Sequence, residues 1–444
     1  MSAPDAAREH WLARHAAWAP RCAGEPAWLA ALRREARDAF AATGLPHVRM
    51  EEWRYTNVAP IARVAFEPAG AEARVSRAAL EAVASPVYAC SFAAFVDGRH
   101  RPELSTPPAI AREVHVQGLR ELLAREPERL AGSLGALVDP KLHPFAALAT
   151  AFLDDGAVLW LPRGVELAEP VHVVFAASGA EPDRAQHPRV LVVAEPGSRA
   201  QVIVDHVALA PARGLTNAVI EVDVGRGAAI DLVVVQRESD AAFHVSNLAA
   251  RIDRDAKLSA HTLSLGGALV RSDASFLLAG EGAACRIHGL FAGSGEQLLD
   301  HHTLVDHAMP HGESRQLTKG ILTGSARGVF RGRVIVRPGA QRTDAEQSNP
   351  NLLLSAGAEV DSKPQLEIHA DDVKCRHGAS IGRLDEDALF YLRTRGVGLR
   401  EAHELLTRGF AAELLEALPV PALGSALAGL LGERLWGAAP GASA

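Results

Sequence analysis

A thiol and an imidazole lie two residues apart near the end of the chain, at Cys375 and His377. The stretch around them, residues 339–382, is built of short apolar runs broken by Gly, Pro and Ser, which is typical of strands and turns. On a strand, residues i and i+2 point to the same face, so the two side chains would lie together. Thiolate and imidazole are ligands for zinc, iron or an iron–sulfur cluster.

Two ligands are too few for a closed metal site, since structural zinc sites use about four. The spacing alone therefore favours the simpler interpretation, in which Cys375 is a small buried side chain and His377 a hydrogen-bonded turn residue. The alternative is that the pair forms half of a site that other residues complete.

A second candidate is the histidine-rich segment DHHTLVDHAMPH, with His301, His302, His307 and His311. Histidines at this density can bind a metal. Hydrogen bonds or ion pairs with Asp300 and Asp306, or contact with a partner, are the favoured interpretation.

A basic run follows the histidines. Its four arginines share one face of a predicted strand, offset by two or four residues: Arg327, Arg331, Arg333 and Arg337. This pattern predicts an acidic face or a partner opposite them, unless the arginines are simply solvated.

Composition restricts the class of protein. The 444 residues suffice for two or three domains, and a hydrophobic content of 48% supports a sizeable core. A net charge of −7 argues against a general nucleic-acid binder. The four scattered cysteines indicate a reducing compartment, and the charged N-terminus resembles no secretory signal. No apolar run is long enough for a membrane span, and no phosphate-binding loop is present, so we expect a cytoplasmic protein that binds no nucleotide.

The elements that would position the candidate residues fall into three parts. Residues 5–18 and 25–43 are predicted to be helical, the second helix ending at Gly44. From residue 157 short strands and turns dominate for over 200 residues. The turn residues Gly197, Gly227, Asp255 and Gly282 are 30, 28 and 27 positions apart. A nearly constant period favours a β-helix over a sandwich or barrel.

After residue 383 the pattern is helical again, beginning with a predicted N-cap at Asp385. The prediction is therefore a mainly β protein with a right-handed parallel β-helix core at residues 157–383. An N-terminal, mostly helical domain (1–156) and a C-terminal helical domain (384–444) flank this core.

Several stretches resemble the SufB/SufD family of iron–sulfur cluster assembly proteins. The match is nearly continuous from His302 to Phe410, and EEWRYTN and PFAALATAF upstream fit the SufD side of the family better than the SufB side. One departure is Ala149, where the family pattern usually has Asn. The main matching motifs are HTLVDHAMPHGESRQLTKGIL, ARGVFRGRVIVRPGAQRTDAEQSNPNLLLS, GAEVDSKPQLEIHADDVKCRHGASIG and LDEDALFYLRTRG.

This resemblance implies a scaffold subunit rather than an enzyme. It implies pairing with SufB through the ends of the β-helices, and binding of the ATPase SufC through the C-terminal helical region; a homodimer is also possible. His377 matches the family's proposed ligand, with Cys375 beside it, so a transient, nascent iron–sulfur cluster shared with the partner would complete the half-site. The candidate residues for partner binding are Leu389, Leu405, Leu406 and Phe410.

Two alternatives remain open. The chain could be the SufB paralogue, although only Cys285 and Cys375 lie in the predicted β-helix, few for a subunit that accepts sulfur. It could also be a β-helix enzyme acting on polysaccharides, although an aromatic content of 5% offers few rings for stacking on sugars. The polar residues available for such a groove are Asp361, Glu367, Asp371, Asp372 and Arg376.

Overall fold

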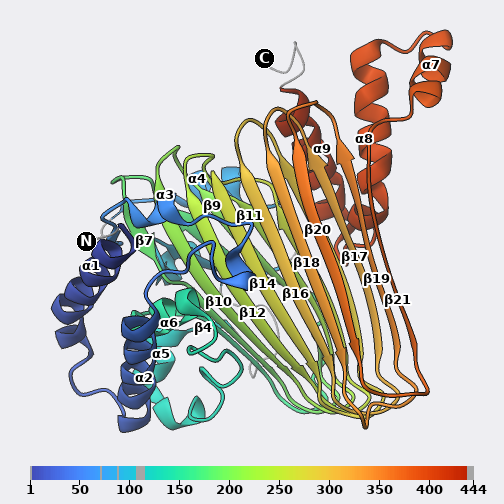
Figure 1. Ribbon diagram of the computed structural model, residues 1–444. Coiled ribbons are helices and arrows are strands. Elements are labelled where there is room, and N and C mark those ends of the chain that lie inside the picture. The colour runs from blue at the N-terminus through green and yellow to red at the C-terminus, as the bar shows by residue number, and fades with distance from the viewer. Residues whose placement is uncertain (1–2, 71–72, 88–89, 107–115, 438–444) are drawn as a thin grey trace.

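The computed structural model describes residues 3–70, 73–87, 90–106 and 116–437 (Figure 1). Two parallel sheets face each other along the length of the molecule, and each coil of the chain contributes one strand to each sheet. The predicted parallel β-helix is therefore confirmed, and the sandwich or barrel is excluded.

Sheet A contains the first strand of each coil. Along the sheet, every strand from β5 to β20 pairs in parallel with its neighbours, and β4 joins the N-terminal end in antiparallel orientation. Its strands are β4 (Val116–Gly118), β5 (Gly156–Leu161), β8 (Arg189–Ala194), β10 (Gly214–Val224), β12 (Phe243–Ile252), β14 (Leu269–Leu278), β16 (Leu298–His307), β18 (Arg327–Val336) and β20 (Glu359–Ile368), with β1 (Glu67–Pro68) and β7 (Arg184–Gln186) attached beside β10.

Sheet B contains the second strand of each coil. Its strands are β3 (Arg99–His100), β2 (Ser91–Val96), β6 (Val171–Ala177), β9 (Arg199–Ala208), β11 (Ala229–Arg237), β13 (Lys257–Ser264), β15 (Ala284–Gly293), β17 (Glu313–Leu322), β19 (Asp344–Leu353) and β21 (Lys374–Gly382). Alternate residues of both sheets fill the space between them with Val, Ile, Leu, Ala and Phe side chains.

The turns from sheet A to sheet B form a stack that explains the sequence period. Gly197 donates its N–H to Arg226 O at 3.0 Å, and Gly227 donates to Arg254 O at 2.9 Å, one coil further on. The residue at this position has a positive φ in successive coils, a conformation that Gly adopts without steric cost. The stack continues beyond the four residues that revealed it, through His311 (φ 61°) and Arg342 (φ 58°).

The N-terminal segment combines helices with strands. It extends both sheets, because β2 pairs with β6 and β4 with β5. Trp11 and Trp18 are buried in the core of this segment. The helices are α1 (Ala3–Trp18), η1 (Ala19–Cys22), α2 (Ala27–Thr43), η2 (Glu51–Trp53), α3 (Ala59–Ala62), α4 (Arg77–Val83), η3 (Pro102–Leu104), α5 (Leu119–Arg125), η4 (Pro127–Arg129) and α6 (Pro144–Ala151).

Three helices follow β21: α7 (Glu386–Thr394), α8 (Leu399–Glu416) and α9 (Pro421–Trp436). The predicted N-cap is confirmed, since the Asp385 carboxylate accepts a hydrogen bond from Asp387 N at 2.8 Å. Helices α8 and α9 pack their apolar faces on the outer face of sheet B, whereas α7 projects from the body (Figure 1). Among the helices in the described ranges, none combines the length and apolar character that a membrane span requires.

Candidate functional site

The β-helix ends in an uncovered coil. Strands β20 and β21 are the terminal strands of sheets A and B, so within the described residues each pairs on one side only. Ile368 and Ile381 occupy positions in register with buried residues of the coil below, yet they are 42% and 52% exposed. An unpaired strand edge next to uncovered apolar side chains is a surface suited to pairing with another chain.

Cys375 and His377 lie on β21, at this open end. Cys375 is partly buried against the core between the sheets, and it lies in register with the buried Ala345 of β19. His377 lies in register with Gln347 and is exposed. Burial raises the pKa of the Cys375 thiol, so the group is protonated at neutral pH until a metal or a neighbouring positive charge favours the thiolate.

The interior of the β-helix becomes polar as it approaches the open end. One register column of sheet B reads Ile287, Gln316, Gln347 and His377 in successive coils. Gln316 and Gln347 are 4% and 1% exposed. His377 thus lies above a buried polar column, whereas Cys375 lies above the apolar side chain of Ala345.

The histidine-rich segment does not form a metal centre. Strand β16 sends its residues to alternate faces, which separates the histidines: His301 accompanies Ser264 inside the β-helix, with 2.8 Å between His301 Nε2 and Ser264 Oγ. His302 lies on the outer face with its Nε2 3.1 Å from an Asp300 oxygen. No group of three or more potential metal ligands occurs in the described parts of the chain. The expected pairing with Asp300 is confirmed for His302, whereas His301 and His307 bond to Ser264 and Ser314 instead.

The basic run meets the acidic face that the sequence predicts. Arg327 pairs with Asp361 at 3.0 Å, and Arg333 pairs with Glu367 at 2.7 Å, both on the adjacent strand β20. Arg337 pairs with Asp306 and Arg331 with Glu52. Because Asp361 and Glu367 are held by arginines on the outside of sheet A, they are not grouped with Cys375 and His377, which lie on sheet B.

One buried ion-pair cluster escaped sequence reasoning. Arg271, on β14, stacks 3.8 Å from the centre of the Trp53 ring. Its guanidinium donates to Asp273 at 2.8 Å and to Asp300 at 2.9 Å, and Asp300 also accepts a hydrogen bond from Thr56. These contacts fix the EEWRYTN motif to the outer face of sheet A. The coil length could have revealed this ion pair in the sequence, because Arg271 and Asp300 are one coil apart and therefore in register on adjacent strands.

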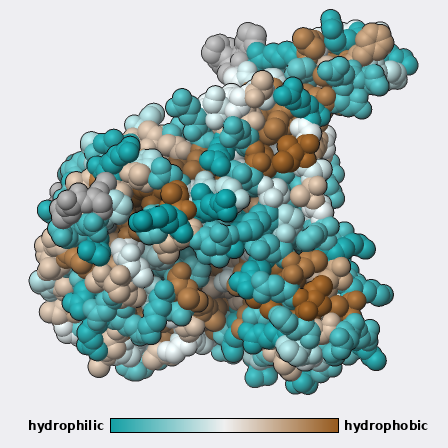
Figure 2. Space-filling view, viewed as in Figure 1, coloured by the Kyte–Doolittle hydropathy of each residue, from teal (hydrophilic) through white to brown (hydrophobic). Residues whose placement is uncertain are grey.

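The predicted partner-binding residues divide into two groups. Leu405 is 45% exposed, and Leu389 and Leu406 are partly buried. Phe410 packs against the outer face of sheet B, where Lys319 Nζ lies 5.1 Å from its ring centre and donates to its carbonyl oxygen at 2.9 Å. Other exposed apolar side chains on α7 and α8 are Phe390, Tyr391 and Leu399. Figure 2 shows apolar side chains on this projecting arm.

Comparison with known proteins adds to this geometry. Residues 175–410 match the family model "SUF system FeS cluster assembly, SufBD core domain", and residues 21–173 match "SufBD protein N-terminal region". The chain belongs to the SufBD family of iron–sulfur cluster assembly proteins.

Three relatives illustrate the similarity. The chain is 33% identical to the iron-sulfur cluster assembly protein SufD of Escherichia coli, over 89% of this chain and 91% of the relative. It is 33% identical to an iron-sulfur cluster assembly SufBD family protein of Synechocystis, over 88% of each chain. It is 30% identical to SufD of Bacillus subtilis, over 63% of this chain and 64% of the relative. The resemblance seen in the sequence motifs is confirmed.

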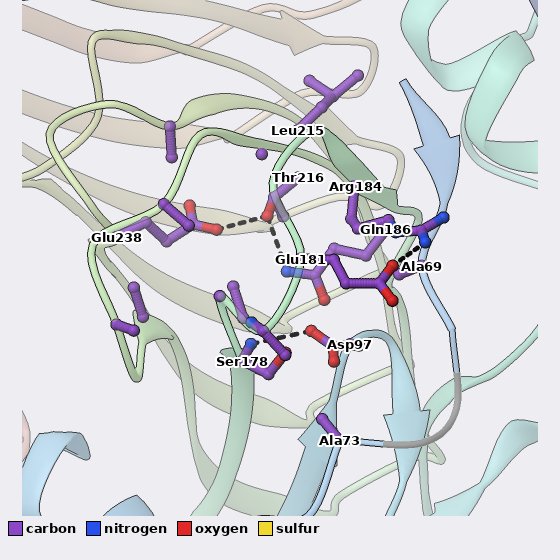
Figure 3. Close-up of a pocket in the computed structure, with 18 of the residues that line it drawn as sticks. Ala69, Ala73, Asp97, Ser178, Glu181, Arg184, Gln186, Leu215, Thr216 and Glu238 are labelled. Atoms are coloured by element: carbon purple, nitrogen blue, oxygen red, sulfur yellow. Dashed lines mark hydrogen bonds and ion pairs between the residues drawn. The ribbon is translucent and has the colours of Figure 1, made fainter. Parts of the chain in front are cut away.

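This SufBD chain also has a hollow of about 480 Å³ near the N-terminal end of its β-helix (Figure 3). Its walls are rich in alanine, and three polar side chains bond to one another beside it. Gln186 Nε2 donates to Thr216 Oγ1 at 2.9 Å, and the Thr216 hydroxyl donates to Glu238. Glu238 also lies 2.6 Å from Nδ1 of His244. This chain of contacts links neighbouring coils and is remote from Cys375 and His377 in sequence and register.

Proposed function

We propose that this chain is a SufD-type scaffold subunit, which pairs with SufB and binds the ATPase SufC during the assembly of iron–sulfur clusters. The observation that carries the proposal is the open end of the β-helix. There, β20 and β21 each have one edge that no other described strand pairs with, and β21 carries the thiol and the imidazole. Family membership and similarity to proteins named SufD support the same role.

In this proposal the nascent cluster is cargo, and it is held only transiently. Cys375 and His377 supply two ligands, and residues of SufB supply the others when the open ends of the two β-helices meet. The partner strand would also satisfy the free N–H and C=O groups of β20 and β21. A second copy of this chain could bind the same edge, so a homodimer is a competing assembly.

SufC would bind the arm formed by α7 and α8. Exposed Phe390, Tyr391, Leu399 and Leu405 supply the apolar contacts there, with Leu389 and Leu406 behind them. Phe410 has a supporting role in this proposal, because it fixes α8 to the β-helix. We further propose that the chain has no catalytic activity of its own, binds no nucleotide and works in the cytoplasm.

The first experiment is anaerobic co-purification of this chain with its SufB and SufC, as wild type, His377→Ala and His369→Ala. His369 is an exposed histidine that directly follows β20 and serves as the matched control. We expect all three complexes to form, with iron and sulfide content after reconstitution reduced only in His377→Ala. Unchanged content in His377→Ala would rule out a ligand role for His377. Failure of the wild-type chain to bind SufB would overturn the proposed function.

The SufC surface has its own test. Leu405→Glu places a charge on an exposed position of α8, so folding should be preserved while SufC binding is lost. Leu142→Glu alters an equally apolar residue that is 72% exposed, outside the proposed surface, and should leave SufC binding intact. Retained SufC binding in Leu405→Glu would move the SufC surface away from α8.

A further inference from the structure

A directed chain of amide hydrogen bonds runs inside the β-helix toward its open end. Gln316 Nε2 donates to Thr303 Oγ1 at 2.7 Å. One coil further on, Gln347 Nε2 donates to Gln316 Oε1 at 2.8 Å. Gln347 therefore directs its N–H group away from the open end, whereas Gln316 directs its own across the interior to β16 of sheet A. Because the nitrogen and oxygen of an amide diverge from the carbonyl carbon, the oxygen of Gln347 cannot share the Gln316 contact that its Nε2 makes.

The chain of hydrogen bonds ends in an acceptor. Gln347 is 1% exposed, and its Oε1 is a buried atom for which the described residues provide no hydrogen-bond partner. A buried acceptor without a donor forfeits the hydrogen bonds that it makes to water in the unfolded chain, so such atoms are normally paired. The residue in register with Gln347 on the last strand is His377, whose ring carries a suitable N–H.

Packing restricts the orientation of the Gln347 amide. On the facing strand β18, a Cβ at Gly332 would lie 2.2 Å from Gln347 Nε2, so the absence of a side chain there makes room for the amide. Two residues along β19, Asn349 accepts a hydrogen bond from Ser362 Oγ at 2.6 Å, which closes the adjacent space between the sheets. Asn351 Nδ2 donates to Ser380 O of β21 at 3.3 Å and fixes the strand that carries His377.

We propose that the exposed His377 ring turns inward and is positioned by Gln347, whose Oε1 accepts a hydrogen bond from Nδ1–H of His377. Nδ1 is the ring nitrogen nearer the strand, whereas Nε2 lies at the outer side of the exposed ring. The bond would fix one tautomer and leave the Nε2 lone pair directed to the open end, where it can bind iron. Metal-binding histidines usually have such a partner on their second nitrogen. This inference rests on the proposed function, and Gln347 itself does not touch the cluster.

The first test measures the tautomer of His377 in the full-length chain, without metal or partner. Nitrogen-15 NMR of the labelled histidine rings at mildly alkaline pH distinguishes Nδ1–H from Nε2–H, and His377→Asn identifies the signal. We expect the Nδ1–H form in wild type. We expect Nε2–H, the preferred form of an unconstrained neutral histidine side chain, in Gln347→Met, and Nδ1–H again in Gln347→Glu, which retains an acceptor oxygen.

Gln236→Met is the matched control, because it removes an amide that is also buried, at 2% exposed, but that lies in an earlier coil and makes no contact with the Gln316–Gln347 chain. It should retain the Nδ1–H form of His377. A wild-type ring in the Nε2–H form, or a tautomer that Gln347→Met does not change, would overturn the inference.

The second test measures iron retention in the complex with SufB and SufC. Loss of a hydrogen bond to a metal-binding histidine weakens metal affinity by roughly ten-fold or more, so Gln347→Met should retain iron correspondingly less well without losing its partners. If Gln347→Met shifts the tautomer but leaves iron retention unchanged, the hydrogen bond is established and the ligand role of His377 fails. The two proposals can thus fail separately.

Discussion

The buried Arg271 cluster predicts a large loss of stability from a single charge-removing substitution, Asp300→Asn. Asp300 is fully buried, 2.9 Å from Arg271, and its Oδ1 is 3.1 Å from His302 Nε2. Burial alone would raise the pKa of Asp300, but the charges of His302 and Arg271, with the hydrogen bonds from His302 and Thr56, hold it well below its usual range. The carboxylate is therefore the charged form at neutral pH.

The magnitude follows from what remains after substitution. Asparagine keeps the size of the side chain and can still accept from Thr56, so the change mainly removes the charge that balances Arg271. Breaking a buried ion pair costs about 3–5 kcal/mol. Because Arg271 retains its two hydrogen bonds to Asp273, we expect the lower end, about 3 kcal/mol.

Asp361→Asn is the matched control. It also pairs with an arginine on the outer face of sheet A, but the side chains of Asp361 and Arg327 are 31% and 41% exposed. Such a pair contributes at most about 1 kcal/mol. Urea denaturation followed by circular dichroism measures both variants. Equal shifts of the two midpoints would refute the argument that burial determines the cost.

The sign of the pH dependence is also fixed. Since the folded protein lowers the pKa of Asp300, its contribution is fully present above the unfolded value near 3.8 and is lost as the pH falls through the folded value. Urea denaturation at neutral pH thus measures the whole contribution of the Asp300 carboxylate to the free energy of unfolding.

Three further predictions concern other parts of the β-helix. Burial lowers the pKa of His187 to about 3, so the folded state does not bind the proton that the unfolded chain binds below its ordinary pKa of 6.5. Lowering the pH from about 7.5 to about 5.5 should therefore reduce the free energy of unfolding by about 1.4 kcal/mol through this group. The substitution His187→Phe should remove that part of the pH dependence, as measured by urea denaturation midpoints. Gly227→Ala should lower the free energy of unfolding by about 1 kcal/mol through backbone strain alone, because φ is +66° while the added Cβ would meet no atom within 4 Å. Gly339→Ala has equal space and no positive φ, so it should leave stability unchanged. Equal calorimetric melting temperatures for the two variants would contradict this. Gly332→Ala should cost about 1–3 kcal/mol by displacing the Gln347 amide, and a melting temperature equal to that of wild type would show that this amide moves freely.

Local chemistry made the β-helix visible in the sequence. The turn at Gly197 and Gly227 requires a positive φ, so small or flexible residues recur once per coil and reveal its length. The same position is occupied by His311 and Arg342 in later coils, where neighbouring strands maintain the conformation and the sequence signal disappears. Alternation along each strand also predicted that Cys375 and His377 share one face, because that relation depends only on the period of a strand.

The sequence by itself therefore determined the family, the β-helix and the positions of its candidate ligands, since these depend on motifs and on contacts between near neighbours along the chain. Only the tertiary structure decided which side chains meet. It separated His301 from His302 by the pleat of β16, gave the arginines their carboxylates on the adjacent strand, and joined Arg271 to a motif 219 residues away at Glu52. It also left β20 and β21 at the ends of their sheets among the described strands. These outcomes depend on register between coils, which is set by the stacking of every preceding coil and not by any local stretch of sequence.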